Sequence, residues 1–174
     1  MNPEPATKGF TLPELLIVMA VFAIAVTSIG PSLLGVMSDN RVASYSRILL
    51  DDLKLARHEA VMRGHRVMVC AITDGDTSVC SNAEAWQNGW MVFADPDQTG
   101  APTADSDILR VQDPLPPSVS VKINVLQDKM YYSPSGRVHA PGNFEFTSNQ
   151  DSAQARGRKI TWDVFRIPTI KIVE

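Results

Sequence analysis

The sequence predicts an α+β fold in which one long N-terminal helix precedes an antiparallel, β-rich region. Residues 15–37 carry no charged side chain and are rich in Leu, Ile, Val, Ala, Met and Phe, and residues 38–64 show apolar side chains at helical spacing. The remaining chain consists of short β-favouring runs separated by Gly, Pro, Asn and Asp. With 174 residues, 44% of them hydrophobic, the chain can form one anchoring helix and one small domain.

The apolar run is long enough to cross a bilayer as a helix. Glu14 lies at its N-terminal edge. A charged side chain near the centre of such a helix costs about 2.5 to 3.5 kcal/mol, so we expect the Glu14 carboxylate to have a partner.

A cleaved secretory signal is the alternative interpretation of this start. Such a signal has an apolar core of about 7 to 15 residues, followed by a small-residue cleavage site. Here the small residue Gly9 precedes the core, the run is longer, and Ser28-Ile29-Gly30 matches a cleavage site poorly. The sequence therefore favours a retained helix.

Residues 9–16, Gly-Phe-Thr-Leu-Pro-Glu-Leu-Leu, resemble the class III signal of type IV pilins and type II secretion pseudopilins. The resemblance implies that residues 1–9 form a leader, which a prepilin peptidase removes between Gly9 and Phe10. It also implies N-methylation of Phe10, a transmembrane and filament-core helix over residues 10–37, and a role for Glu14 in assembly.

Elementary chemistry agrees with this resemblance. Cleavage would create a positive amine at Phe10, and the amine of a neighbouring subunit could neutralise Glu14 in a bundle of low dielectric. Pro13 falls in the first turn, where its missing N–H breaks no helical bond. Gly30-Pro31 lies inside the helix, and we expect it to kink or loosen it.

Residues 38–64 are predicted to continue the helix as an amphipathic segment. Its apolar stripe is expected to pack against a sheet and comprises Val42, Tyr45, Leu49, Leu53, Ala56 and Ala60. Gly64 is the expected C-terminal stop.

Residues 65–174 are predicted to form the β-rich part of the domain. The expected strands are 66–72, 90–94, 108–111, 118–125, 129–133, 144–147, 158–164 and 169–173.

The two cysteines, Cys70 and Cys80, lie ten positions apart. If the domain is outside the inner membrane, an oxidising compartment favours a disulfide between them. Buried free thiols, or a metal or redox role, remain alternatives.

Further motifs resemble the GspH/FimT-like minor pilins and pseudopilins, a group that includes FimU. They are the segment from Cys70 to Cys80, the run Trp-Gln-Asn-Gly-Trp-Met-Val-Phe-Ala-Asp at 86–95, and Tyr-Ser-Pro-Ser-Gly-Arg at 132–137. The resemblance implies a type IV pilin-like fold, in which the long helix packs on an antiparallel β-sheet domain. Trp86 and Trp90 are expected to pack under the loop and against the helix.

No enzyme, cofactor or metal site is predicted. Four aspartates near a Gly turn offer calcium-type ligands, but their spacing does not match an EF-hand, so a solvated turn is preferred: Asp95, Asp97, Asp105 and Asp107. The three histidines, His58, His65 and His139, have no Ser or Cys partner in a nucleophile motif.

Charge is distributed unevenly. Residues 65–120 hold 2 basic and 8 acidic side chains, whereas residues 121–174 hold 8 basic and 5 acidic ones, within a formal net charge of −3. Candidate DNA-binding residues are Arg156, Arg158, Lys159 and Arg166. FimT-like proteins linked to DNA uptake carry a C-terminal Gly-Arg-x-Arg signature, and residues 157–160 match only its first half.

The sequence thus predicts a minor pilin of the type IV pilus, placed at or near the tip to start assembly and serving motility, adhesion or DNA uptake. The alternatives are a GspH-like pseudopilin of type II secretion and a FimT-like DNA receptor. Expected partners are the prepilin peptidase, other major and minor pilins or pseudopilins, the inner membrane and, for the receptor, DNA. The expected location is the inner membrane with a periplasmic domain, and then the pilus or pseudopilus.

Overall fold

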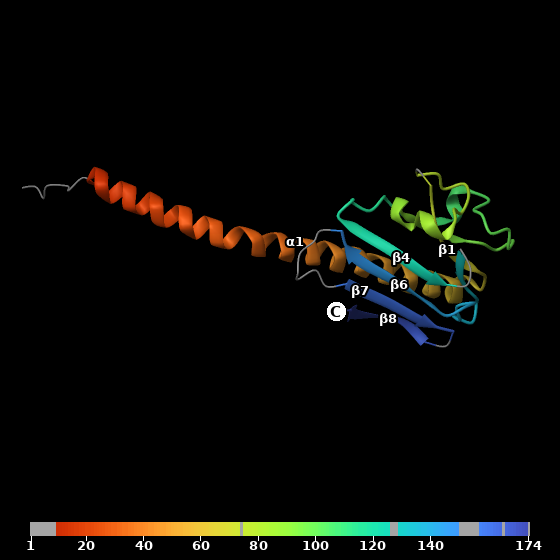
Figure 1. Ribbon diagram of the computed structural model, residues 1–174. Coiled ribbons are helices and arrows are strands. Elements are labelled where there is room, and N and C mark those ends of the chain that lie inside the picture. Colours follow the sequence, from red (N-terminus) through yellow and green to blue (C-terminus); the bar gives the residue numbers. More distant parts are fainter. Residues whose placement is uncertain (1–9, 74, 126–128, 150–156, 165, 174) are drawn as a thin grey trace, which may run out of the picture.

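The protein consists of one long helix and two antiparallel sheets that pack along its C-terminal half (Figure 1). The structure is a computed structural model, and it describes residues 10–73, 75–125, 129–149, 157–164 and 166–173. The side chains of residues 26–35, 83, 84, 125 and 166 lie outside this description. The N-terminal half of the helix extends away from the domain as a free rod (Figure 1).

Helix α1 runs from Leu12 to Arg63, and its ends follow from local chemistry. Pro13 lies in the first turn, where no backbone donor is needed. At the other end Gly64 has a φ of 71°, and its N–H donates to the Ala60 carbonyl at 3.1 Å. The helix is uninterrupted at Gly30-Pro31, so the expected loosening does not break it. Pro31 removes one donor, and the helical turns on both sides hold the segment.

The strands form two four-stranded sheets. One has the order β3-β2-β1-β5 and the other the order β4-β6-β7-β8, with all neighbours antiparallel. Their bounds are β1 Val67–Ala71, β2 Trp90–Ala94, β3 Ile108–Gln112, β4 Val119–Val125, β5 Lys129–Tyr132, β6 Gly142–Ser148, β7 Gly157–Asp163 and β8 Arg166–Val173. Two short 3-10 helices, η1 Ala83–Asn88 and η2 Asp105–Asp107, lie between strands.

Every strand expected from the sequence forms, and the α+β prediction is confirmed. The largest differences are at β6 and β8, which begin two and three residues earlier than predicted. Strand β8 contains Pro168, which lies outside the predicted strand, and β8 is at the edge of its sheet, where a missing donor is tolerated. The division into two sheets was not predicted.

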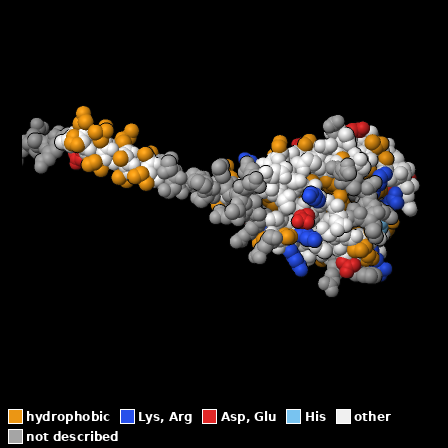
Figure 2. All heavy atoms as spheres, viewed as in Figure 1, with side chains coloured by type: hydrophobic (Ala, Val, Ile, Leu, Met, Phe, Trp, Pro, Cys, Tyr) orange, Lys and Arg blue, Asp and Glu red, His pale blue; other side chains and the backbone are white. Residues whose placement is uncertain are grey.

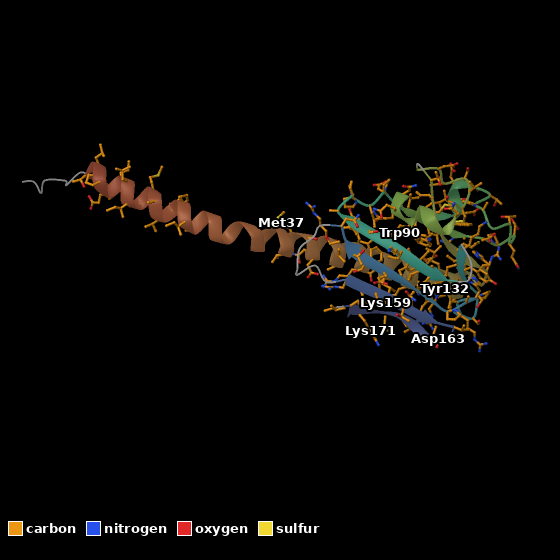
Figure 3. All side chains as sticks on the ribbon, viewed as in Figure 1. Met37, Trp90, Tyr132, Lys159, Asp163 and Lys171 are labelled. Atoms are coloured by element: carbon orange, nitrogen blue, oxygen red, sulfur yellow. A yellow bond between two sulfur atoms is a disulfide. The ribbon has the colours of Figure 1, made fainter. Side chains whose placement is uncertain are left out.

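The predicted apolar stripe of α1 forms the centre of the core. Five of its members are fully buried: Val42, Leu49, Leu53, Ala56 and Ala60. Aromatic rings from several elements join them, with Trp86 and Phe144 at 4.5 Å and Phe144 and Trp162 at 5.0 Å between centroids. The packing role expected of Trp86 and Trp90 is confirmed, and Trp90 is labelled in Figure 3.

A buried carboxylate ties the helix to the first sheet. Asp52 accepts a hydrogen bond of 2.8 Å from the indole N–H of Trp90 in β2. The guanidinium of Arg110 in β3 lies 3.2 Å from the other carboxylate oxygen. Burial raises the pKa of Asp52 above its ordinary value of 3.8, against the opposing effects of Trp90 and Arg110.

The side chain of Gln87 closes one edge of the second sheet. Its amide nitrogen donates to the Val119 carbonyl at 2.8 Å, and its amide oxygen accepts from the Val121 N–H at 3.4 Å. This amide therefore takes the place of a further strand beside β4, which reduces the exposed edge.

Cys70 and Cys80 are joined by a disulfide with a Cα–Cα distance of 5.6 Å. Cys70 belongs to an apolar cluster on the face of the first sheet turned away from α1, with Met68, Ile72, Met91 and Phe93. Closing a loop of this length stabilises the fold by about 2 to 3 kcal/mol. The alternative of free thiols is excluded for this structure.

We predict that Gly89→Ala destabilises the protein by about 3 kcal/mol or more. Gly89 has a φ of 101°, and a Cβ there would lie 2.1 Å from the backbone oxygen of Gln112. Gly75 is the matched control, because it also has a positive φ, but a Cβ there would meet nothing within 4 Å. Gly75→Ala should therefore lower the free energy of unfolding by only about 1 to 2 kcal/mol, the cost of placing a Cβ on a residue with positive φ. Equal losses for the two variants in urea unfolding would contradict this account.

A second prediction concerns pH. In the unfolded chain the Asp52 carboxyl has its ordinary pKa of 3.8, whereas in the folded protein its pKa is raised. Between these two pKa values the folded protein binds the Asp52 proton more tightly than the unfolded chain does. The free energy of unfolding therefore falls as pH rises from 3.8 through the raised pKa. Asp52→Asn keeps an acceptor for the Trp90 N–H and cannot ionise. We expect a flatter dependence of stability on pH above 3.8 and no loss at neutral pH.

Asp52→Ala serves as the comparison, because it leaves the indole N–H unpaired and should lose about 1 to 3 kcal/mol at every pH. Urea unfolding at a series of pH values measures both variants. An unchanged pH slope in Asp52→Asn would show that another group carries the dependence.

Candidate assembly surfaces

The first half of α1 presents exposed apolar side chains, and Figure 2 shows those of residues 10–25 on the face in view. Its large apolar side chains are more than half exposed and comprise Phe10, Leu12, Leu15, Leu16, Ile17, Val18, Met19, Val21, Phe22 and Ile24. A helix that is apolar on every side needs cover from lipid or from other helices. This half of α1 is therefore the first candidate assembly surface.

Within the part of the chain that the structure describes, no helix is long and apolar enough to cross a membrane. The predicted span of residues 10–37 includes 26–35, whose side chains lie outside the described residues. The transmembrane role of residues 10–37 stays a prediction.

Glu14 lies in the first turn of α1 and is hydrogen-bonded to Thr11, the residue before the helix. Its carboxylate accepts from the backbone N–H and the hydroxyl of Thr11, both at 3.2 Å. A carboxylate at this place also favours the helix N-terminus electrostatically. Phe10 is 84% exposed, whereas Gly9 and the rest of the expected leader lie outside the described residues. Cleavage and methylation at Gly9 and Phe10 stay predictions.

Three polar contacts fix α1 where it enters the domain. The hydroxyls of Ser38 and Ser148 are hydrogen-bonded. Asp39 accepts from Arg158 in β7 at 3.3 Å. Arg41 donates to the Ser118 hydroxyl at 3.3 Å, ahead of β4. These contacts set the direction of the free rod relative to the second sheet.

The predicted DNA-binding residues do not form one exposed cluster among the residues described. Arg158 and Lys159 are neighbours in β7, so their side chains lie on opposite faces of the sheet. The Arg158 side chain is only 13% exposed because it pairs with Asp39. Arg166 begins β8 with its side chain outside the description, and Arg156 lies outside the described residues altogether.

The far end of the domain contains a stacked polar group. The guanidinium of Arg66 binds the Asp95 carboxylate, with Nε at 2.9 Å from Oδ2, and lies 4.9 Å from the ring centroid of Tyr131. The His139 ring stacks on Tyr131 at 4.4 Å, and burial lowers the pKa of His139. An open cleft of about 380 Å³ lies beside this group, lined by Gly64, His65, Arg66, Pro96, Gln98, Tyr131, Ser133 and Pro134.

The solvated turn expected for the four aspartates is wrong for Asp95, which is buried. Besides Arg66, Asp95 binds the N–H groups of Thr99 at 2.9 Å and Gly100 at 3.2 Å, so it organises the turn from inside. Asp107 instead accepts from Thr103 and Ala104 at the start of η2. Within the described ranges, no three His, Cys, Asp or Glu side chains are placed to hold a metal ion.

Sequence reasoning missed a row of charged side chains across the second sheet. Lys122 pairs with Glu145, Glu145 with Lys159, and Lys159 with Lys171 in the strand register. Lysines at outward positions of predicted strands were visible in the sequence. Their alignment needed the strand order and register, which the sequence did not provide.

Comparison with known proteins gives the family. The family described as type II transport protein GspH matches residues 46–163, and the prokaryotic N-terminal methylation motif matches residues 5–30. No curated protein sequence is found to match this chain.

Two solved structures show the same fold. The type IV minor pilin FimU of Pseudomonas aeruginosa (strain PAO1) has a TM-score of 0.54 and 20% identity, covering 78% of this chain and 90% of FimU. The minor pseudopilin EpsH from the type 2 secretion system of Vibrio cholerae has a TM-score of 0.54 and 12% identity, covering 76% of this chain and 96% of EpsH. Because the family match extends over more than half of the chain and both folds agree with it, this protein belongs to the GspH family of minor pilins and pseudopilins.

Proposed function

We propose that this protein is a minor pilin of the type IV pilus, processed by a prepilin peptidase and built in at or near the tip, where it starts assembly. The observation that carries the proposal is the half of α1 over residues 10–25, whose apolar side chains are exposed on every side. The methylation motif over residues 5–30 supports processing of this same segment.

The first step is a change of surroundings for α1. Before assembly the inner membrane covers the apolar half, and in the fibre the helices of neighbouring subunits replace the lipid. Moving apolar side chains from lipid to other apolar side chains changes little in free energy, so van der Waals packing and polar contacts select the arrangement.

Glu14 supplies such a polar contact. Among the described residues, Thr11 supplies the hydrogen-bond donors to the Glu14 carboxylate, which lies beside apolar side chains. Cleavage before Phe10 creates an ammonium group that a neighbouring Glu14 can bind in a medium of low dielectric. Because an unpaired charge there is penalised, this pairing favours one register between subunits.

A type II secretion pseudopilin is the second candidate, and a specific observation supports it. The fold resembles EpsH as closely as FimU, with a TM-score of 0.54 for each, and the matching family is described as a type II transport protein. The same processing and helix packing would operate there. A DNA receptor is less favoured, because Arg158 is engaged by Asp39 and faces α1 rather than solvent.

We predict that Gly9→Ala blocks or slows removal of the leader, because the peptidase must accommodate the residue before the cleaved bond. Intact mass and N-terminal sequencing of the membrane-extracted protein measure this. The wild type should begin at a methylated Phe10, and the variant should keep residues 1–9. Gly64→Ala, at the other end of α1, is a matched control that should be processed normally.

A mature-sized variant at normal abundance would contradict the peptidase assignment. A wild-type chain that begins near Met1 or beyond Gly30 would contradict the filament role itself, because the apolar helix would then be unprocessed or lost.

Deletion of the gene in the native host separates the two candidates. For the type IV pilin we expect fewer surface fibres, normal protein secretion, and recovery of the wild-type protein in the sheared fibre fraction. Loss of secretion with normal fibre numbers would instead assign the protein to the secretion system. Complementation with the Gly9→Ala variant should fail in either case.

A further inference from the structure

Cations surround the end of the domain from which the free rod leaves. α1 enters the domain at Ser38, which is hydrogen-bonded to Ser148 at the C-terminal end of β6. Because the strands are antiparallel, the beginnings of β4 and β7 and the end of β8 lie at this same level. Three exposed or partly exposed cationic side chains lie near this level, namely Arg41, Lys159 and Lys171. Figure 3 shows Lys159 and Lys171 closer to the rod than Asp163 is.

The charge of these cations is largely unbalanced. Within the described part of the chain, no ion pair includes Arg41, Lys159 or Lys171. Asp39 lies at the same level, but its carboxylate is already paired with Arg158 at 3.3 Å. Glu145 is opposite Lys159 in the strand register and offsets one of the charges. The end of the domain beside the rod is therefore positive.

Apolar side chains accompany the cations. Val36 and Met37, on the turn of α1 just before the domain, are 56% and 55% exposed. Ile172 of β8 is 57% exposed, and its register partner is Arg158, which binds Asp39 of α1. Ile172 therefore lies on the face of the second sheet that is turned toward α1. We name six residues the basal collar: Val36, Met37, Arg41, Lys159, Lys171 and Ile172.

The opposite end of the domain is acidic. α1 ends before Gly64, which lines the open cleft together with Pro96 and Gln98, so the turn after β2 lies at this far end. Asp97 in this turn and Asp105 at the start of η2 are exposed and belong to none of the described ion pairs. The part of α1 inside the domain, residues 38–63, is about 39 Å long. The acidic end is therefore several Debye lengths from the basal collar.

An anionic lipid surface matches this arrangement. The basal collar adjoins the apolar half of α1, so lipid headgroups would lie at the level of Met37. Lys and Arg side chains beside a membrane helix attract anionic headgroups, and apolar side chains enter the boundary between headgroups and acyl chains. A domain that lay flat would bring Asp97 and Asp105 to the same anionic surface, which repels them. The charges therefore favour an upright domain.

Nucleic acid matches the basal collar less well. A phosphate backbone pairs with cations and offers nothing to the exposed Val36, Met37 and Ile172. The interfacial region of a bilayer takes cationic and apolar side chains together. The basal collar also lies directly beside the apolar half of α1, where a lipid surface is at hand.

We propose that the basal collar binds the headgroups of anionic phospholipids and holds the domain upright on the membrane before assembly. The inference rests on the proposed function for one point, the position of the apolar half of α1 in the inner membrane. Entry into a fibre breaks these lipid contacts, so the basal collar opposes premature extraction of the subunit.

The test uses the full-length chain at one copy per nanodisc, which excludes contact between copies. The bilayer is phosphatidylcholine, with or without about 30% phosphatidylglycerol. A short pulse of acetic anhydride modifies free amines, and mass spectrometry gives the rate at each lysine. We expect phosphatidylglycerol to slow acetylation of Lys159 and Lys171 about fivefold, and about 500 mM NaCl to remove the difference by screening. Lys54 and Lys129, farther from the rod, are internal controls and should react equally in both bilayers.

A pair of variants tests the lipid preference. Lys159→Gln with Lys171→Gln removes two charges of the basal collar and keeps the size of the side chains. Electron paramagnetic resonance of spin-labelled phosphatidylglycerol and phosphatidylcholine measures which lipid the chain selects. We expect the wild type to prefer phosphatidylglycerol about fivefold and this variant about twofold or less. Lys54→Gln with Lys129→Gln is the matched control and should keep the wild-type preference, with unchanged melting temperatures verifying that both variants fold.

Several results overturn the inference. These are equal acetylation of Lys159 and Lys171 in both bilayers, or a preference for phosphatidylglycerol that Lys159→Gln with Lys171→Gln leaves unchanged. Protection of the two lysines by single-stranded DNA of about 30 bases, without protection by phosphatidylglycerol, assigns the basal collar to nucleic acid instead. A chain that enters neither bilayer contradicts the proposed function as well. A chain that enters both bilayers and shows equal rates contradicts the basal collar alone.

Discussion

A single continuous helix meets two different surroundings, and this constraint governs the rest of the structure. In its second half α1 has one apolar stripe, which both sheets bury, while in its first half apolar side chains point in every direction and nothing in the described part of the chain covers them. The fold can satisfy only the second half. Stability of the first half depends on lipid or other subunits, so an unfinished hydrophobic surface is built into the monomer.

The polar contacts of the domain keep the rod and the sheets in one relative orientation. Asp52 joins the helix to β2 and β3, and Asp39 joins it to β7. Each is a charged group in a poorly hydrated place, so breaking one partner leaves the other unsatisfied. A subunit whose helix packs into a filament therefore presents its domain faces at a defined angle. The contacts of Asp39 and Asp52 therefore determine which faces of the domain are turned toward a neighbouring subunit.

The β4 edge and the two faces of the second sheet differ in what lies against them. Gln87 fills the outer side of β4 with its amide, and α1 occupies the inner face. The outer face carries the charged row that strand register forms from Lys122, Glu145, Lys159 and Lys171. The Gln87 amide limits random strand pairing at the β4 edge, and the charges on the outer face make non-specific apolar association there unfavourable.

The helix and the strands could be predicted from the sequence because their signals are local. The uncharged run, the helical stripe, the stop at Gly64 and the β-favouring runs were sufficient for one helix and eight strands, and short motifs of few residues were enough for the family. Features that depend on pairing between distant residues came only from the folded domain. Asp95 is buried because Arg66 reaches it from the start of β1, Arg158 faces inward because it pairs with Asp39, and three lysines line up because of strand register. Register and sheet order arise from packing of the whole domain, and local sequence patterns do not contain them.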